Sequence, residues 1–358
     1  MTEELSIEQN GAKGSTNHQN NDMSTNNNLT VINNGISYSD ARQIALDVYK
    51  TEAQNYAGEA YETSKERTEK LIDAYLEKLF SVENNNSQKL KSPSMQQALF
   101  YAQKGYAVDD TGLTKDNYVE LLLSRIGSQD RSILQISIDE AIKTIEKLTF
   151  EQMDCLSFIF LIFNPQEELT SFVNLKKHFD NLCELYHPSF NLPMTPLYLK
   201  SVNTCVSFDS AKQYIPIEDF MGKSFPGLFF KGFDSLEFTS NFSKPIASYR
   251  KILLKDIRNS EKLQINAINE PTLNSLITGT NMEEDREKIV NYFKQHIMNT
   301  AEIREDLLVL NSKMQDLLET WKNSDLKFCQ LTPVGIIIAI TNYNKKFHKN
   351  IDYSKYIH

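Results

Sequence analysis

The sequence lacks the paired cysteines that mark a disulfide framework or a zinc finger. Its 358 residues include four cysteines, which are widely spaced and form no C-x-x-C pair. This spacing supports neither a disulfide-stapled fold nor a cysteine-ligated metal. The P-loop, H-E-x-x-H and G-x-S-x-G motifs are missing as well. We therefore expect no catalytic residue, no metal and no cofactor.

Long apolar runs and an excess of positive charge are also missing. The most apolar stretches, residues 155–163 and 334–340, are about half as long as the ~20 residues of a membrane-spanning helix. The net charge of −9 argues against a general nucleic-acid binder, because phosphate neutralisation needs clustered lysine and arginine. The first ten residues are polar and acidic, unlike a signal peptide. We expect a soluble, cytoplasmic protein.

Residues 1–35 form a leader that is rich in Asn, Gly, Ser and Thr and has one apolar cluster. One interpretation is a disordered segment, because so little apolar surface cannot offset the entropy of ordering. The other is self-association, because Asn and Gln side chains can ladder between copies stacked in register. The second interpretation predicts a homo-oligomer, or a protein partner with a matching tail. The cluster that would form its short strand is Leu29, Thr30, Val31 and Ile32.

The stretch from residue 35 to 80 predicts one long helix. Ser37 can cap it, no proline interrupts it, and apolar or small residues recur on one side at helical spacing. About 44 residues at ~1.5 Å each give a rod of roughly 65 Å, which cannot bury its apolar stripe alone. The small residues Ala53, Ala57 and Ala60 would let another helix approach closely. We interpret them as a second candidate interaction surface.

The N-terminal region resembles a little-characterised bacterial protein family. The resemblance rests on the leader Gln9-Asn-Gly-x-x-Gly-Ser-Thr-Asn-x-Gln19, on LTVINNGISYSDARQIALDVYK after it, and on ALFYAQKGYA at 98–107. It extends from Gln9 to about Phe163. Leaders of this type are associated with bacterial amyloid-signalling motifs on defence proteins, so the resemblance implies a role in anti-phage or stress defence. It implies no catalytic residue.

A buried helix is predicted at the centre of the fold. Thr149 and Gln152 have the spacing of a capping box, and the apolar stretch 155–163 follows them directly. Because this stretch is apolar on all sides, we expect it to be covered by other elements. A second buried helix is predicted after Thr332, over residues 334–340.

The middle of the chain predicts irregular structure. Seven of the ten prolines lie between residues 187 and 274, which favours short helices and loops, with a hairpin near 225–238. Residues 281–323 fit one long helical stripe. The predicted fold is all-α: a long N-terminal helix with a multi-helix bundle, an irregular Pro-rich middle and C-terminal helices.

Three parts are expected along the chain. Residues 1–35 are the leader, 36–187 hold the long helix with a helical domain, and 188–358 hold the Pro-rich connector and a C-terminal helical domain.

The favoured function is a non-enzymatic interaction or signalling protein that self-assembles through its leader or its long helix. One alternative is a hydrolase or nuclease that uses His178, Cys183 and His187, which lie near each other on one predicted helix. A buried cysteine beside helix-terminal histidines explains the same pattern structurally. Another alternative is membrane disruption after a conformational change that exposes 155–163 and 334–340.

Overall fold

The computed structural model describes residues 36–82, 86–108, 112–166, 169–201, 204–208 and 214–357. Contacts between residues divide the chain into Met1–Gly35 and Ile36–His358, and every described residue belongs to the second unit. The predictions on the leader, including Leu29 to Ile32, therefore lie outside the described residues.

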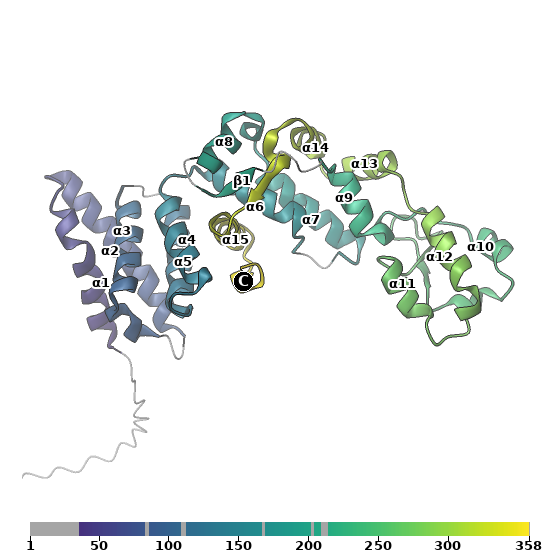
Figure 1. The fold of residues 1–358 in the computed structure, drawn as a ribbon, viewed down its shortest axis with the longest axis horizontal. Helices are drawn as coiled ribbons and strands as arrows, with labels where there is room; N and C mark the ends of the chain where they lie inside the picture. Colours follow the sequence, from purple (N-terminus) through teal and green to yellow (C-terminus); the bar gives the residue numbers. More distant parts are fainter. Residues whose placement is uncertain are drawn as a thin grey trace, which may run out of the picture. The chain divides into compact units, whose positions relative to one another are not determined.

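Helices dominate the described part of the chain (Figure 1), which confirms the predicted all-α class. The first group is α1 (Tyr38–Ala53), α2 (Glu59–Phe80), α3 (Pro93–Val108), α4 (Gly112–Gly127) and α5 (Ile133–Ile145). The next is α6 (Phe150–Phe163), α7 (Phe172–Leu185), α8 (Met194–Ser201), α9 (Ile217–Ser224) and α10 (Ser235–Asn241). The last is α11 (Glu270–Ile277), α12 (Arg286–Gln295), α13 (Thr300–Leu308), α14 (Met314–Asn323) and α15 (Pro333–Phe347).

Two small antiparallel sheets accompany these helices. Strand β1 (Val206–Phe208) pairs with β4 (Cys329–Leu331), and Ser207 lies opposite Gln330. Strand β2 (Leu253–Lys255) pairs with β3 (Leu263–Ile265). The first sheet joins segments that are far apart in the sequence, and the second is a local hairpin.

The prediction of one long N-terminal helix was wrong, because the stretch folds into the two helices α1 and α2. Ser37 caps α1 as expected, but α1 ends at Ala53 and the chain turns at Gly58, whose φ of +55° lies in the left-handed region. The two helices pack against each other (Figure 1). Arg42 Nε and Nη2 donate hydrogen bonds of 2.6 and 3.1 Å to the two carboxylate oxygens of Asp73. The apolar stripe is thus buried within the chain.

The predicted central helix is confirmed as α6. Thr149 and Gln152 form the capping box, and the residues from Met153 to Ile162 are all buried. Helix α15, capped by Thr332 as predicted, packs along α6, and Ser157 Oγ donates a hydrogen bond of 2.9 Å to the Ala339 carbonyl. The two most apolar segments of the chain therefore cover each other.

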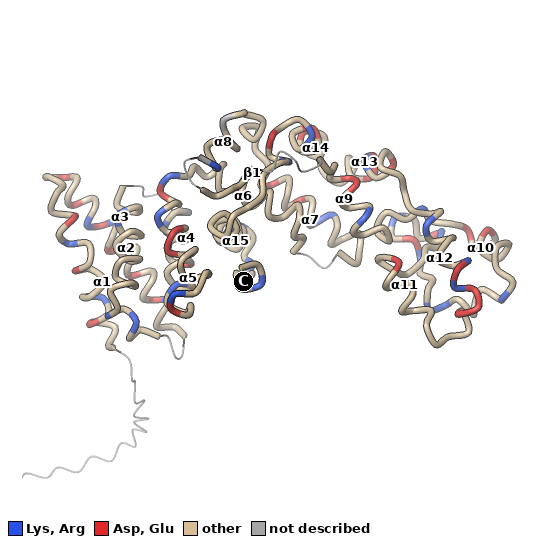
Figure 2. The backbone as a smooth tube through the Cα atoms, viewed as in Figure 1, with Lys and Arg blue, Asp and Glu red and all other residues tan. Residues whose placement is uncertain are grey.

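Helix α15 also contacts α4 and α5, so the last helix of the chain lies against the first bundle. Contacts keep Ile36–His358 together as one unit, and the predicted boundary between residues 187 and 188 stays a prediction. Lys and Arg positions lie among Asp and Glu positions on α4 and α5 (Figure 2), and one ion pair joins these two helices. Arg125 Nε on α4, for example, lies 2.6 Å from Asp139 Oδ1 on α5.

Two local predictions in the second half of the chain were wrong. The hairpin is not at 225–238 but at β2–β3, where Asp256 Oδ1 accepts bonds from the main-chain N–H groups of Arg258 and Asn259 and so stabilises the turn. The stripe over 281–323 is three helices, α12 to α14. A capping box of Asn299 with Glu302 starts α13, which explains why one helix does not continue.

The described residues hold two large apolar cores. The larger joins α1 to α9 with α13, α14 and α15. The smaller lies between residues 230 and 293, and seven of its fifteen buried residues are aromatic. Four of the five phenylalanines between residues 225 and 238 are buried: Phe229, Phe230, Phe233 and Phe238.

Candidate functional site

The candidate site lies on the smaller core, where polar side chains line a hollow. Its rings contact one another closely: Phe238 and Phe242 stack with centroids 4.4 Å apart, and Phe233 meets Tyr292 edge-on at 5.1 Å. Each such aromatic pair adds about 0.5–1.5 kcal/mol beyond the area it buries. The ring cluster thereby fixes α10, α12 and the β2–β3 hairpin as one frame.

A histidine and a glutamate meet at the edge of this aromatic frame. The Nδ1 of His296 lies 2.8 Å from the Tyr292 carbonyl, and its Nε2 lies 3.0 Å from Glu237 Oε1. The Tyr292 hydroxyl donates to the same carboxylate oxygen at 3.2 Å. Because a carbonyl and a carboxylate only accept, both contacts of the ring are hydrogen bonds when both ring nitrogens carry protons.

The surroundings of Glu237 favour the charged form of its carboxylate. The hydrogen bond from His296 lowers the pKa of Glu237, while burial opposes it and Tyr292 adds to the lowering. Burial raises the pKa of Tyr292, with the Glu237 charge as the next cause. Glu237 is therefore an ionised acceptor and Tyr292 a neutral donor at neutral pH.

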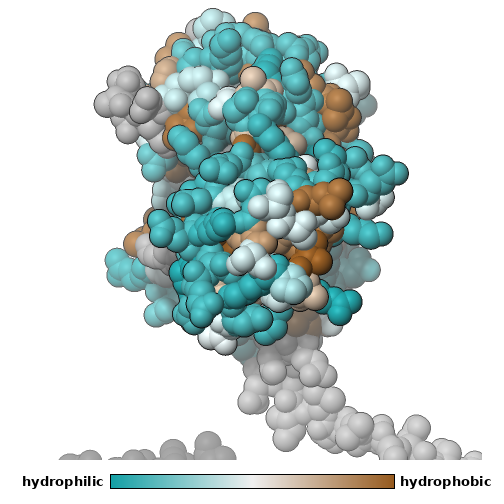
Figure 3. All heavy atoms as spheres, turned by 90° about the vertical axis from the view of Figure 1, so that its right-hand side faces the viewer, coloured by the Kyte–Doolittle hydropathy of each residue, from teal (hydrophilic) through white to brown (hydrophobic). Residues whose placement is uncertain are grey.

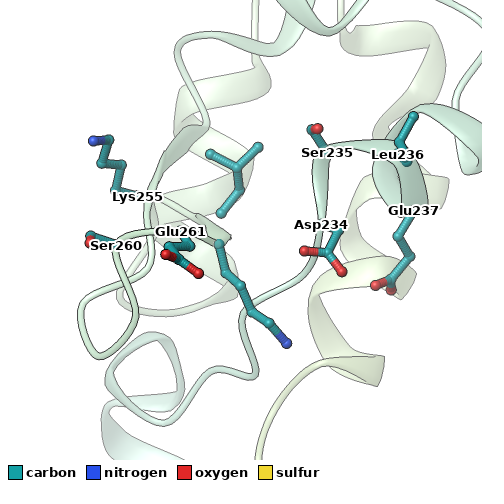
Figure 4. A pocket seen from close by; sticks show the side chains of 9 residues that line it. Asp234, Ser235, Leu236, Glu237, Lys255, Ser260 and Glu261 are labelled. Atoms are coloured by element: carbon teal, nitrogen blue, oxygen red, sulfur yellow. The ribbon is translucent and has the colours of Figure 1, made fainter.

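Glu237 also lines a hollow of about 580 Å³ between α10 and the β2–β3 hairpin (Figure 4). Asp234 lies beside it at the start of α10, and Lys255 and Lys262 lie on the hairpin side. None of Asp234, Lys255 and Lys262 forms an ion pair with a described residue. The remaining lining residues are Ser235, Leu236, Ser260, Glu261 and Leu263.

The walls of this hollow suit a short polar segment with one apolar side chain. Carboxylates on one wall face ammonium groups on the other, and Leu236 is 80% exposed. Figure 3 shows this side of the molecule, where a group of apolar side chains lies among polar ones.

Strand β2 offers a second binding feature, an unpaired edge. In the β2–β3 ladder, Leu254 lies opposite Gln264, and bonds from Asn266 to Ile252 and from Asp256 to Lys262 flank that pair. The main-chain groups of Leu253 and Lys255 therefore point away from β3. No described main-chain group bonds to them. Such an edge can accept an added strand.

A family model matches residues 35–357, which is more than half of the chain. The chain belongs to this uncharacterised family. No curated protein and no solved structure matches the chain. The match begins at residue 35, so the leader predicted to self-associate precedes the part of the chain that the family shares.

The three residues of the hydrolase alternative each contact a different neighbour. The Sγ of Cys183 lies 3.5 Å from Met314 Sδ, and burial raises the pKa of this thiol to about 12. His178 is 1% exposed and packs edge-on against Phe179. His187 Nε2 lies 2.9 Å from Asp154 Oδ2. A neutral, covered thiol is a poor nucleophile, so the geometry does not favour this alternative.

Sequence reasoning missed the role of Asp154. This carboxylate is 6% exposed, on the mostly apolar helix α6, and it accepts hydrogen bonds of 2.8 Å from Asn342 Nδ2 and from Lys346 Nζ on α15. With His187 it forms a polar cluster that links α6, α15 and the end of α7. The signal in the sequence is an acidic residue directly before the apolar stretch 155–163.

The predicted interaction residues of the N-terminal helices have different exposures. Ala53 is 6% exposed and is covered by its own chain, in a cluster with Tyr49 and Ala107. Ala57 and Ala60 are exposed, at the turn between α1 and α2 and at the start of α2. The three do not form the continuous stripe that an uninterrupted helix would present. Their role in assembly stays a prediction.

Two searches over the described residues complete the site. No group of three or more His, Cys, Asp or Glu residues within the described ranges is arranged to hold a metal ion. Among the described helices, none has both the length and the apolar character needed to cross a membrane.

Proposed function

We propose that this protein is a non-enzymatic interaction and signalling protein that self-assembles through its N-terminal leader. The observation that carries the proposal is the division of the chain at residue 35. Contacts separate Met1–Gly35 from the compact unit that follows, and the family match starts at the same position. A segment rich in stackable amides, with one β-prone tetrad, thus precedes a body that folds around its own core.

The compact unit supplies recognition in this proposal. The hollow beside α10 and the edge of β2 lie on one rigid aromatic frame, and Asp234, Lys255 and Lys262 at the hollow form no ion pair with a described residue. Assembly through the leader brings several copies of this surface together, which raises its effective affinity for a multivalent partner. The partner class is another protein that presents a short polar segment.

Assembly through the N-terminal helices has less support. The apolar stripe that motivated it is buried between α1, α2 and α3, and Ala53 belongs to that buried surface. The leader is therefore the favoured assembly element.

The setting we assign is the bacterial cytoplasm, in anti-phage or stress defence. The resemblance of the leader to amyloid-signalling motifs supports the defence role. The four cysteines support the compartment, because all four are buried and none forms a disulfide, as is usual where thiols stay reduced.

The test compares the full chain with a chain lacking residues 1–34 and with Val31→Pro, by sedimentation velocity over a range of concentrations. The full chain should form oligomers, and both variants should sediment as monomers, because proline removes a ladder donor. Melting temperatures should be nearly equal, since the leader adds little apolar surface to the core. Ser6→Pro, a proline outside the tetrad, serves as the matched control and should assemble normally.

Two results would contradict the proposal. One is a full chain that is monomeric at every concentration. The other is a Val31→Pro variant that assembles as the full chain does.

A further inference from the structure

A second hollow, of about 420 Å³, lies on the smaller core and shares no lining residue with the first. One wall is the end of a short 3₁₀ turn (Ile246–Tyr249) and the two residues after it, and the other is the turn that follows α11. No aspartate or glutamate lines it. The lining residues are Ala247, Ser248, Arg250, Lys251, Gly279, Thr280, Asn281 and Met282.

The two cations of this hollow are unengaged within the described part of the chain. Arg250 and Lys251 are both exposed, and no described carboxylate forms an ion pair with either side chain. Their charges are adjacent in sequence and line one cavity, so each raises the positive potential at the other. An anion that reaches this hollow meets two donors that need not first leave another partner.

The three acidic residues that follow the lining residue Met282 in the sequence already have cationic partners. Arg286 Nη2 lies 3.2 Å from Glu283 Oε1, and Lys244 Nζ lies 3.0 Å from Glu284 Oε2 and 3.2 Å from Asp285 Oδ2. These three carboxylates therefore offset little of the charge of Arg250 and Lys251. Among the cations named here, Arg250 and Lys251 are the ones without a described carboxylate partner, and both line the hollow.

The two walls are fixed to each other by the same groups. Lys244 Nζ donates a bond of 2.6 Å to the Asn281 carbonyl, and the Tyr249 hydroxyl donates one of 2.8 Å to Asp285 Oδ2. The turn itself is held by Thr280, whose hydroxyl donates to the Ile277 carbonyl and accepts from the Met282 N–H. A cavity whose walls are set before binding loses little entropy when a ligand enters.

The turn contributes open space and neutral donors. Gly279 has φ +70°, and a Cβ added there would meet no atom within 4 Å, so this position leaves the hollow unobstructed. The Ser248 hydroxyl and the Asn281 amide also line the hollow. Hydroxyl and amide donors beside a guanidinium and an ammonium are the groups that bind phosphate oxygens in proteins.

We infer that this hollow binds the phosphate group of a small phosphorylated molecule, with Arg250 and Lys251 as the charge-bearing contacts. Arginine suits two phosphate oxygens at once through its forked donors, and lysine adds a point charge. The volume lies within the range of small-molecule sites, so it leaves room for the group that carries the phosphate. The site is separate from the hollow of the proposed function and does not depend on assembly.

The test is isothermal titration calorimetry of the full chain with inorganic phosphate, ribose 5-phosphate and ribose. Ribose 5-phosphate should bind, and ribose should give no heat. The double variant Arg250→Gln, Lys251→Gln should weaken binding by about tenfold or more, because it removes both charges at nearly constant size. Both side chains are exposed, so its circular dichroism and melting temperature should match those of the unmodified protein.

The matched control is Lys255→Gln, Lys262→Gln, which removes two lysines from the other hollow. It should bind ribose 5-phosphate within about twofold of the unmodified protein, because exposed charges at a distance are screened. Two results would overturn the inference as a whole. One is the absence of binding by the unmodified protein up to about 10 mM ligand, where millimolar sites are detectable. The other is an equal loss in both double variants. If inorganic phosphate binds as tightly as ribose 5-phosphate, the site recognises the anion alone, and the assignment to a phosphorylated molecule is overturned.

Discussion

Replacing Asp154 by alanine should destabilise the protein more than any other loss of a single charge in α6. The carboxylate is buried and accepts from Asn342 and Lys346, and it lies 2.9 Å from the His187 ring. Hydrogen bonds to a charged group are worth about 1.5–3 kcal/mol each when both partners are buried. The three partners are not equally buried, so the three values cannot be added.

The exposure of the partners sets the expected size of the effect. The side chains of His187 and Lys346 are 35% and 26% exposed, so water can replace much of the interaction with the Asp154 carboxylate that they lose. Asn342 is 7% exposed, but its amide also donates to Ser157 Oγ at 3.0 Å, which leaves it one partner. We therefore expect Asp154→Ala to lower the free energy of unfolding by about 2–4 kcal/mol, below the upper range for a broken buried pair.

Urea unfolding at pH 7, followed by circular dichroism, measures this difference. Glu151→Ala is the matched control, because Glu151 is exposed on the same helix, and its loss should cost less than ~1 kcal/mol. Asp154→Ala combined with Asn342→Ala should cost less than the sum of the two single changes, because the pair shares one hydrogen bond. A loss below ~1 kcal/mol for Asp154→Ala, or strict additivity, would refute the reasoning.

Two further predictions concern the two cores. Phe158 is fully buried, and its ring centroid lies 5.5 Å from that of Phe190 and 6.3 Å from that of Trp321. Phe158→Ala should therefore lower the free energy of unfolding, measured with urea, by about 3–5 kcal/mol. A change under ~1 kcal/mol would mean that α6 is peripheral. The folded-state pKa of Glu237 is lowered below its ordinary value of 4.5, so its contribution to stability is present above that value and is lost as the pH falls below it. Glu237→Gln should therefore reduce the pH dependence of the melting temperature below pH 4.5, and an unchanged profile would contradict this.

The features that the sequence predicts correctly are mostly local. The caps at Ser37, Thr149 and Thr332 depend on residues three positions apart, and the burial of α6 follows from its own composition. The break between α1 and α2 was missed because the same apolar stripe serves one long helix or two helices folded together. The choice is made by tertiary packing, which local periodicity does not encode.

The candidate sites were missed for a related reason. The Glu237–His296 pair joins residues 59 positions apart, and the hollow with Arg250 and Lys251 is closed by a turn about 30 residues further along. No spacing rule connects such residues. Local composition likewise does not show that α12 packs over the aromatic residues near Phe230.

The position of α15 has a consequence for how the protein is made. Helix α6 is complete at residue 163, but the helix that covers it begins at residue 333. At the usual elongation rates of about 5–20 residues per second, the ribosome needs roughly 10–30 s to add the residues between them. During that interval the growing polypeptide displays one of its most apolar surfaces without its native cover, which is the state that chaperones recognise. A chain released before α15 is synthesised would keep that surface open, so quality-control proteases would distinguish truncated products from finished ones by this single missing helix.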